Sequence, residues 1–273
     1  NSHLLKAQLP TPLLDAVSQA GVIRSIVVVL NIIGHKREKT VEVARGRGTG
    51  EAGHTTLTHS LRHLVENYMP RQYRQPLYCA VQVREIDRRM VAEGSTLNGF
   101  GLMQRAATAA YDHLRQRWPG IQKLCVLCGV GNNAGDGYVM AALAACDGLD
   151  VQLVAVRDPS DLQGDAARAF EMALEAGLQA TPWRSELALQ GEVIVDALLG
   201  TGLEGEVREP FATAIRTINA SGLPVLAVDI PSGLSADSGA VLGSAVHADV
   251  TLTFIADKFG LHSGDAVDHV GER

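Results

Sequence analysis

The chain has 273 residues, of which 46% are hydrophobic, and a formal net charge of −6. This length allows one large α/β domain, or one domain with an appendage. No apolar run reaches the ~18–20 residues that a membrane span requires, and the negative charge argues against nucleic acid as the main partner. The four cysteines lack the spacing of a disulfide framework, so we expect a cytoplasmic protein.

The first 68 residues are predicted to be a poorly patterned extension. They combine a strand-like run, a basic cluster and a loop rich in glycine, threonine and histidine. Two interpretations stay open: a native appendage, or sequence upstream of the true start that is translated from a neighbouring frame. We favour the second, and we predict that the domain itself covers residues 69–273.

From residue 76 onward the pattern becomes a regular alternation of helices and strands. Periodicity predicts helices over 80–93, 99–117, 136–147, 161–176 and 209–220, and strands over 123–129, 151–156, 192–196, 224–229 and 249–255. Such alternation indicates an α/β fold with a mostly parallel sheet and helices on both faces. Cys125 and Cys128 are three apart in one strand, so we expect them on opposite faces, where they share neither a metal nor a disulfide.

Glycine turns and acidic residues follow three of the predicted strands. The first strand ends in Gly129-Val-Gly-Asn-Asn-Ala-Gly-Asp136, the third in Asp196, and the fourth in Asp229, with Ser232 just beyond. Ligands of open parallel sheets bind outside the carboxyl ends of the strands. We therefore expect these residues to line one cleft.

The first of these loops fits a dinucleotide-binding turn. Gly129, Gly131 and Ala134 match G-x-G-x-x-G/A, and Asp158 falls where a ribose-binding acid is expected. Asp136, however, is predicted at the helix start, where it either caps the helix or binds a ligand.

Two further acids, Asp196 and Asp229, would repel a bare pyrophosphate in this cleft unless a cation is also bound. Asn133 and Ser232 offer neutral oxygens, and such a mixed set suits a hard cation, either monovalent or magnesium. The residues alone therefore predict a nucleotide-like ligand beside a hard cation.

Six segments in order resemble the NAD(P)H-hydrate epimerase family, the YjeF N-terminal domain, over about residues 77–273. They are "LYCAVQVREIDRRM", "GFGLMQRAA", "GVGNNAGDGYVMA", "VDALLGTGLEGEVREP", "LAVDIPSGLSADSG" and "ADVTLTFIADKFGL". The family loop more often has glycine where this chain has Ala134, which we expect to be tolerated unless its φ is positive. The resemblance implies a Rossmann-like three-layer αβα sandwich.

The resemblance also implies an activity: proteins of this family interconvert the R and S forms of hydrated NADH and NADPH (NADHX and NADPHX). It implies potassium bound by Asn133, Asp196 and Ser232. It implies substrate contacts from Asn132, Asn133, Ala134, Gly135 and Asp136, from Gly200, Thr201, Gly202, Leu203, Glu204, Gly205 and Glu206, and from Asp229.

The reacting carbon of such a substrate, C6, carries a hydroxyl that must leave and return on the other face of the ring. A carboxylate near the ring can stabilise the iminium-like state or act as base, and we expect Asp229 to do so. Lys258 has two interpretations: a donor to the departing oxygen, or a solvated surface lysine.

Two rival functions stay open, a non-catalytic binding or scaffold module of the same family and an NAD-dependent oxidoreductase. The presence of Asn133, Asp196, Asp229 and Ser232 together favours the epimerase. We also expect an ADP-dependent NAD(P)HX dehydratase domain as partner, in cis or in trans, because only the S form can be dehydrated back to the cofactor. We expect a homo-oligomer that binds neither nucleic acid nor a membrane.

Overall fold

The computed structural model describes residues 76–91 and 98–273. Residues Leu77–Arg273 form one compact unit, which contains every helix and strand described below. The predicted extension over 1–68 and its boundary with the domain lie outside the described residues.

A parallel sheet of six strands forms the centre of this unit. Its strands are β1 (Lys123–Cys128), β2 (Asp150–Ala155), β3 (Thr181–Pro182), β4 (Val193–Ala197), β5 (Val225–Val228) and β6 (Val250–Leu252). Their order across the sheet is β3-β2-β1-β4-β5-β6, and every neighbouring pair is parallel. The chain therefore reverses its direction of travel across the sheet between β1 and β4, which is where open α/β folds bind ligands.

The helices of the described residues connect these strands or precede them. They are α5 (Ala80–Met90), α6 (Gly99–Arg117), α7 (Asn132–Cys146), α8 (Gly164–Glu175) and α9 (Phe211–Ala220), with short 3-10 helices at Pro159–Asp161, Phe259–His262 and Ala266–Asp268. None of them is long and apolar enough to span a membrane.

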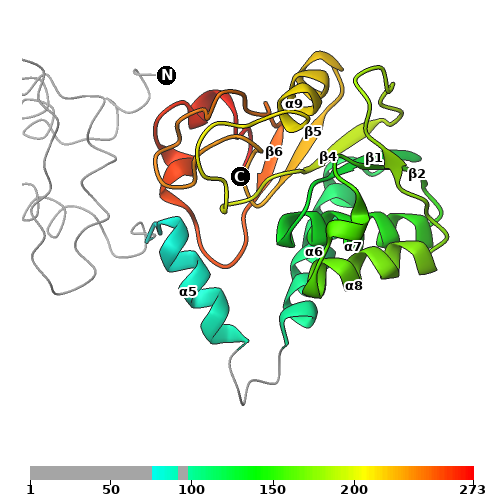
Figure 1. The fold of residues 1–273 in the computed structure, drawn as a ribbon, viewed down its shortest axis with the longest axis horizontal. Coiled ribbons are helices and arrows are strands. Elements are labelled where there is room, and N and C mark those ends of the chain that lie inside the picture. Colours follow the sequence, from blue (N-terminus) through cyan, green and yellow to red (C-terminus); the bar gives the residue numbers. More distant parts are fainter. Residues whose placement is uncertain (1–75, 92–97) are drawn as a thin grey trace, which may run out of the picture. The chain divides into compact units, whose positions relative to one another are not determined.

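Two apolar clusters on opposite faces of the sheet make three layers. α6, α7 and α8 pack on one face and α9 on the other, as Figure 1 shows. Cys128 belongs to the first cluster and Cys125 to the second, and both are free and buried. The three-layer αβα architecture and the opposite orientation of these cysteines are thus confirmed.

α7 is the most enclosed helix of the described residues, because the sheet, α6 and α8 all pack against it. A Cβ on Gly137 would lie 2.5 Å from Cβ of Ala197 and 2.9 Å from Sγ of Cys128. Real Cβ atoms do not approach other atoms that closely, so glycine sets the distance between this helix and strands β1 and β4. The start of α7 is thereby pressed against the sheet beside the carboxyl ends of the strands.

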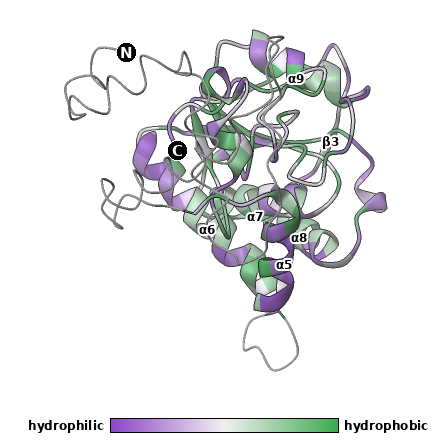
Figure 2. Cartoon of the chain, turned by 90° about the vertical axis from the view of Figure 1, so that its left-hand side faces the viewer, coloured by the Kyte–Doolittle hydropathy of each residue, from purple (hydrophilic) through white to green (hydrophobic). Residues whose placement is uncertain are grey.

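α5 lies outside the main helical layer, against the loops that follow β5 and β6 (Figure 1). Its Ala80 packs in a third cluster with Ile230 and Leu234. The backbone N–H of Ala80 donates to Oδ1 of Asp237 at 2.6 Å. Figure 2 colours α5 partly purple and partly green, as expected of a helix with one buried stripe.

The predicted elements agree with the observed ones except at a few boundaries. The two-residue strand β3 was not predicted, since a segment that short carries no periodicity. The larger error concerns α7, which begins at Asn132 instead of the predicted residue 136.

Candidate active site at the carboxyl edge of the sheet

Three neighbouring strands deliver polar residues to one edge of the sheet, as predicted. In the pairing of β1 with β4, Cys128 stands beside Ala197, and in the pairing of β4 with β5, Asp196 stands beside Ala227. Asp229 directly follows β5. The ends of β1, β4 and β5 therefore lie side by side at the point where the strand order reverses.

The loop after β1 leads straight into the first turn of α7. Gly131 precedes the helix with φ 113, a value that side chains rarely tolerate, and no side chain caps this end. The backbone N–H groups of Asn132, Asn133 and Ala134 are then the first of the helix, where no intrahelical acceptor exists. Such an end binds phosphate readily.

The interpretation of Asp136 as a helix cap is wrong. The helix begins four residues earlier, so Asp136 lies in its second turn, and the bare N–H groups stay open to a pyrophosphate. Ala134 adopts a helical, negative φ, as expected of a tolerated substitution. Ala134 and Gly135 are buried, and the Gly135 N–H already donates to the Gly131 oxygen, so of these two residues Ala134 alone can offer its N–H to a ligand.

Asp196 and Ser232 form a fully buried pair. Oδ1 of Asp196 accepts from Oγ of Ser232 at 2.6 Å, and Oδ2 accepts from the Ser232 N–H at 2.8 Å. Burial raises the pKa of Asp196 from 3.8 to about 6, while the hydrogen bonds from Ser232 and from the Leu198 N–H oppose that rise. A negative charge here is costly, so a cation beside it would be favourable.

Asn133 offers the clearest indication that something else belongs at this point. Both polar atoms of its amide are buried and have no hydrogen-bond partner in the described residues. Its side chain lies against Gly200, since a Cβ there would be 3.1 Å from Cβ of Asn133. The neighbouring Leu199 accepts from and donates to Oγ of Ser232. Contacts thus connect Asn133 through the 199–200 turn to Ser232 and Asp196.

These residues fit a hard monovalent cation in their chemistry, since they offer one amide, one carboxylate and one hydroxyl oxygen. No group of three or more His, Cys, Asp or Glu side chains within 76–91 and 98–273 could hold a metal ion. A dense carboxylate cage of the kind that suits divalent ions is therefore absent from that part of the chain.

Asp229 and Lys258 form a close ion pair at the end of β5. The Lys258 ammonium donates to Oδ1 of Asp229 at 2.6 Å, and the Lys258 side chain has no exposed surface. Asp229 is partly exposed and adopts φ 69, a strained value for a residue with a side chain. Strain of this kind is typical of functional positions.

One of the two sequence interpretations of Lys258 needs correction. It is not a solvated surface lysine, because it is fully buried. Its ammonium also donates to Oγ1 of Thr253 and to the backbone oxygens of Phe254 and Ala256. The three N–H donors are thus shared among four acceptors, so donation to a departing oxygen, the other interpretation, would require one of these bonds to be released. Lys258 serves to hold Asp229 and to balance its charge.

Sequence reasoning missed Asp87 on α5. It is close enough to Asp229 that the two charges interact, and burial together with Asp229 raises the pKa of Asp87. The only available signal was spacing, since Ala80, Val83 and Asp87 share one face of a helix. That signal places Asp87 on the buried face but does not show what the face meets.

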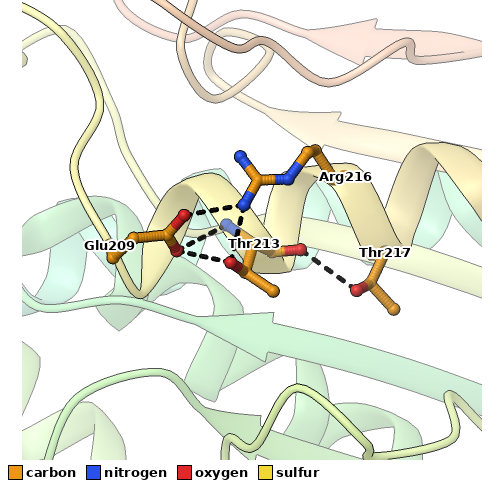
Figure 3. Close-up of polar contacts among 4 residues, drawn as sticks. All are labelled: Glu209, Thr213, Arg216 and Thr217. Carbon is orange, nitrogen blue, oxygen red and sulfur yellow. Dashed lines mark hydrogen bonds and ion pairs between the residues drawn. The ribbon is translucent and has the colours of Figure 1, made fainter.

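The loop Gly200–Glu206 follows β4 and borders the same edge. Thr201 and Leu203 are partly buried, whereas Gly202, Glu204, Gly205 and Glu206 are exposed and available to a ligand. Just beyond, Glu209 accepts from the backbone and hydroxyl of Thr213 and from Arg216 (Figure 3). Glu209 thus satisfies one of the free backbone N–H groups at the start of α9.

Comparison with known proteins shows the family to which the chain belongs. Residues 99–260 match the family model described as YjeF-related protein N-terminus. The chain is 45% identical over 196 residues to the bifunctional NAD(P)H-hydrate repair enzyme Nnr of Coxiella burnetii, covering 72% of this chain and 40% of that protein. It is 43% identical over 184 residues to the enzyme of the same name from Escherichia coli, covering 67% and 36%.

A solved structure supports the fold independently. The crystal structure of the yeast protein ynu0 aligns with a TM-score of 0.61 at 19% identity, covering 69% of this chain and 84% of that one. The chain spans about two fifths of the length of the two curated bacterial relatives above.

Proposed function

Since the chain belongs to the YjeF-related N-terminal family, we propose that it interconverts the R and S forms of hydrated NADH and NADPH. One observation carries this proposal. The uncapped start of α7, suited to a pyrophosphate, lies at the same edge of the sheet as the Asp229–Lys258 pair, suited to chemistry on a ring. The names of the relatives indicate the substrate class. The geometry provides a helix end for the pyrophosphate and a carboxylate for the chemistry of the ring.

Binding follows from the backbone of the first turn of α7. The pyrophosphate of a dinucleotide would accept from the N–H groups of Asn132, Asn133 and Ala134. The exposed residues of the loop Gly200–Glu206 lie beside this turn and would border the rest of the substrate. The hydrated ring would then face the end of β5, where Asp229 is partly exposed.

The chemistry follows from charge. The C6 hydroxyl leaves as the lone pair of the ring nitrogen forms a double bond to C6, so positive charge develops on the ring. The Asp229 carboxylate stabilises that charge, and Lys258 fixes its orientation through a bond to one of its two oxygens. Water then adds to the opposite face of C6 and loses a proton, which neutralises the hydroxide that left, and this completes the inversion.

Potassium is part of the proposal. Asn133, Asp196 and Ser232 would hold the ion, and the buried amide of Asn133, which has no hydrogen-bond partner among the described residues, supports this assignment. When bound, the ion would supply a fixed positive charge near the pyrophosphate. The residues themselves anchor the 199–200 turn and the start of α7 to β4.

The partner enzyme, the oligomeric state and the cellular location are proposals as well. The bacterial relatives are named bifunctional repair enzymes and extend well beyond the matched region. We therefore propose that an ADP-dependent dehydratase, in cis or in trans, consumes the S form. We propose a homo-oligomer in the cytoplasm.

The direct test follows R-NADHX by chromatography in the presence of the purified protein. The expected result is an approach to the R/S equilibrium much faster than the spontaneous rate, with heat-inactivated protein as control. Binding of NADHX without any acceleration would instead support the scaffold module. Reduction of NAD⁺ by an added alcohol or aldehyde would support the oxidoreductase.

A further inference from the structure

The departing oxygen of the proposed reaction has no proton donor so far. A hydroxyl leaves more easily as water than as hydroxide, so a group that supplies a proton beside C6 speeds the step. The Asp229 carboxylate is an acceptor, and every N–H of the Lys258 ammonium is already engaged within the described residues. The groups that surround this ion pair are therefore the candidates.

The Lys258 ammonium makes two short contacts and two longer ones. Its Nζ lies 2.6 Å from Oδ1 of Asp229 and 2.6 Å from Oγ1 of Thr253, which follows β6. The backbone oxygens of Phe254 and Ala256 are 3.1 and 3.3 Å away. Two of the three protons therefore point to Asp229 and Thr253, and the backbone oxygens share the third. Because the protons of an ammonium are arranged tetrahedrally, these carboxylate and hydroxyl oxygens lie about 4 Å apart.

The Thr253 hydroxyl keeps a proton of its own. An ammonium can only donate, so Oγ1 of Thr253 accepts from Lys258, and its O–H makes no hydrogen bond within residues 76–91 and 98–273. Thr253 is partly exposed, whereas Lys258 is fully buried, so this proton can reach a ligand that the ammonium cannot. The bond from a charged donor also makes the hydroxyl a stronger donor.

Asp229 presents a free acceptor close to this donor. Its Oδ1 accepts from Lys258 and, at 3.2 Å, from the Phe254 N–H, whereas Oδ2 accepts no hydrogen bond within the described part of the chain. Asp229 and Thr253 thus offer one free carboxylate oxygen and one free hydroxyl proton around a single buried ammonium. A ring that becomes positive while its hydroxyl departs needs both.

We propose that Thr253 is a catalytic residue that gives its hydroxyl proton to the departing C6 oxygen and takes a proton from Lys258 in return. Lys258 then supplies the proton through Thr253, without touching the substrate and without releasing a partner for it. This inference rests on the proposed epimerase function and deepens it.

The step balances without any other reactant. The C6–O bond breaks as the nitrogen lone pair forms the C=N bond, the departing oxygen takes the Thr253 proton, and Thr253 takes a proton from Lys258. Water leaves, the lysine is a neutral amine, and the Asp229 carboxylate stabilises the positive ring. On return, water adds to the other face of C6, the C=N electrons go back to nitrogen, and Asp229 takes the surplus proton. Lys258 recovers that proton from Asp229, its hydrogen-bond partner, which restores all three groups.

The test compares Thr253→Val with Thr253→Ser. Valine keeps the shape of the side chain but has no hydroxyl, so the turnover number should fall about 10²–10⁴-fold with little change in affinity for NADHX. Serine keeps the hydroxyl and should restore most of the parent rate. The measurements are the R-to-S exchange rate as a function of substrate concentration and, separately, NADHX binding by calorimetry.

The same variant distinguishes this role from a structural one. Without the Thr253 hydroxyl, the three N–H donors of Lys258 still meet three acceptors, on Asp229, Phe254 and Ala256. A hydroxyl that served only to hold the lysine could therefore be lost with little effect on the rate. We expect the melting temperature of Thr253→Val to stay close to that of the parent while its turnover number falls.

Thr251→Val is the matched control, since this nearby hydroxyl is buried and donates to the Val270 oxygen. It should lower stability and leave the turnover number of the folded protein unchanged. A parent-like turnover number in Thr253→Val, a loss of affinity alone, or a Thr253→Ser variant that is equally slow overturns the inference and leaves the epimerase function intact. A parent protein that binds NADHX without accelerating the exchange overturns the proposed function, and the relay with it.

Discussion

Asp229 combines a strained backbone with a fully buried counter-ion. A φ of 69 costs energy for any side chain, and a lysine without exposed surface must be held by its partners. Neither feature is needed to end a strand, so both are better explained by the position they give to one carboxylate at the edge of the sheet.

For Asp229→Asn we predict a turnover number about 10²–10⁴-fold lower with little change in affinity for NADHX. Asparagine keeps the size and one accepting oxygen but loses the charge that stabilises the ring. The measurement is the R-to-S exchange rate as a function of substrate concentration. Asp150→Asn, at the exposed start of β2, is the control. Loss of affinity alone would make Asp229 a binding residue.

The buried carboxylate of Asp196 should make the free energy of unfolding depend on pH and on potassium. Its pKa in the folded protein is about 6, above its ordinary 3.8, so its contribution to folding is complete below about pH 4 and is lost as the pH rises through 6. The loss amounts to about 3 kcal/mol for a shift of about two pKa units. A cation beside the carboxylate should lower its pKa and restore that stability.

We therefore expect potassium to raise the melting temperature more at pH 7.5 than at pH 5, measured against a bulky organic cation. In Asp196→Asn the difference between the two pH values should vanish, because no carboxylate is left to charge. An equal potassium response of parent and variant at both pH values would refute the assignment of this ligand.

Among the elements, α7 shows what can and what cannot be predicted from the sequence. Its existence and its place after β1 were predicted, but its start was placed four residues late. Asn132, Asn133 and Gly135 resemble a turn by composition, and tertiary packing against β1, β4, α6 and α8 overrides that preference. With that late start, the predicted helix did not include the free N–H groups of Asn132, Asn133 and Ala134, and Asp136 fell at its cap position.

α5 shows a different limit. The bounds of the helix were predicted to within three residues, yet its partner was not, because nothing local indicates that Ala80 packs against the loops after β5 and β6. The same holds for Lys258, whose burial depends on acceptors from Thr253 and Asp229 that only the fold brings together. In contrast, Asp196, Asp229 and Ser232 were found because parallel strands end at a common edge.

The packing of α7 gives a prediction at this scale. Gly137→Ala should lower the free energy of unfolding by about 1–3 kcal/mol, since the added methyl overlaps Ala197 and Cys128. Gly120→Ala is the matched control, because a Cβ there meets nothing within 4 Å. Urea unfolding of both variants checks it, and equal stability of the two would contradict the close packing.

For the whole molecule, the compact unit that begins at Leu77 predicts where the chain can be shortened. A protein that begins at Met69 should keep the melting temperature and epimerase activity of the full chain. A protein that begins at Gly99 should be less stable, because it lacks α5, with its bond from Ala80 to Asp237. A melting temperature several degrees lower for the Met69 protein would show that the preceding residues support the fold.

The most direct test of the account is repair of pure R-NADHX by a separate, S-specific ADP-dependent dehydratase. With dehydratase alone, NADH should appear only as fast as the R form epimerises spontaneously. With this chain added, we predict that NADH formation accelerates until the dehydratase itself limits the rate, and that Asp229→Asn removes the acceleration. An unchanged rate of NADH formation with the parent protein would contradict the assignment of an epimerase to this site.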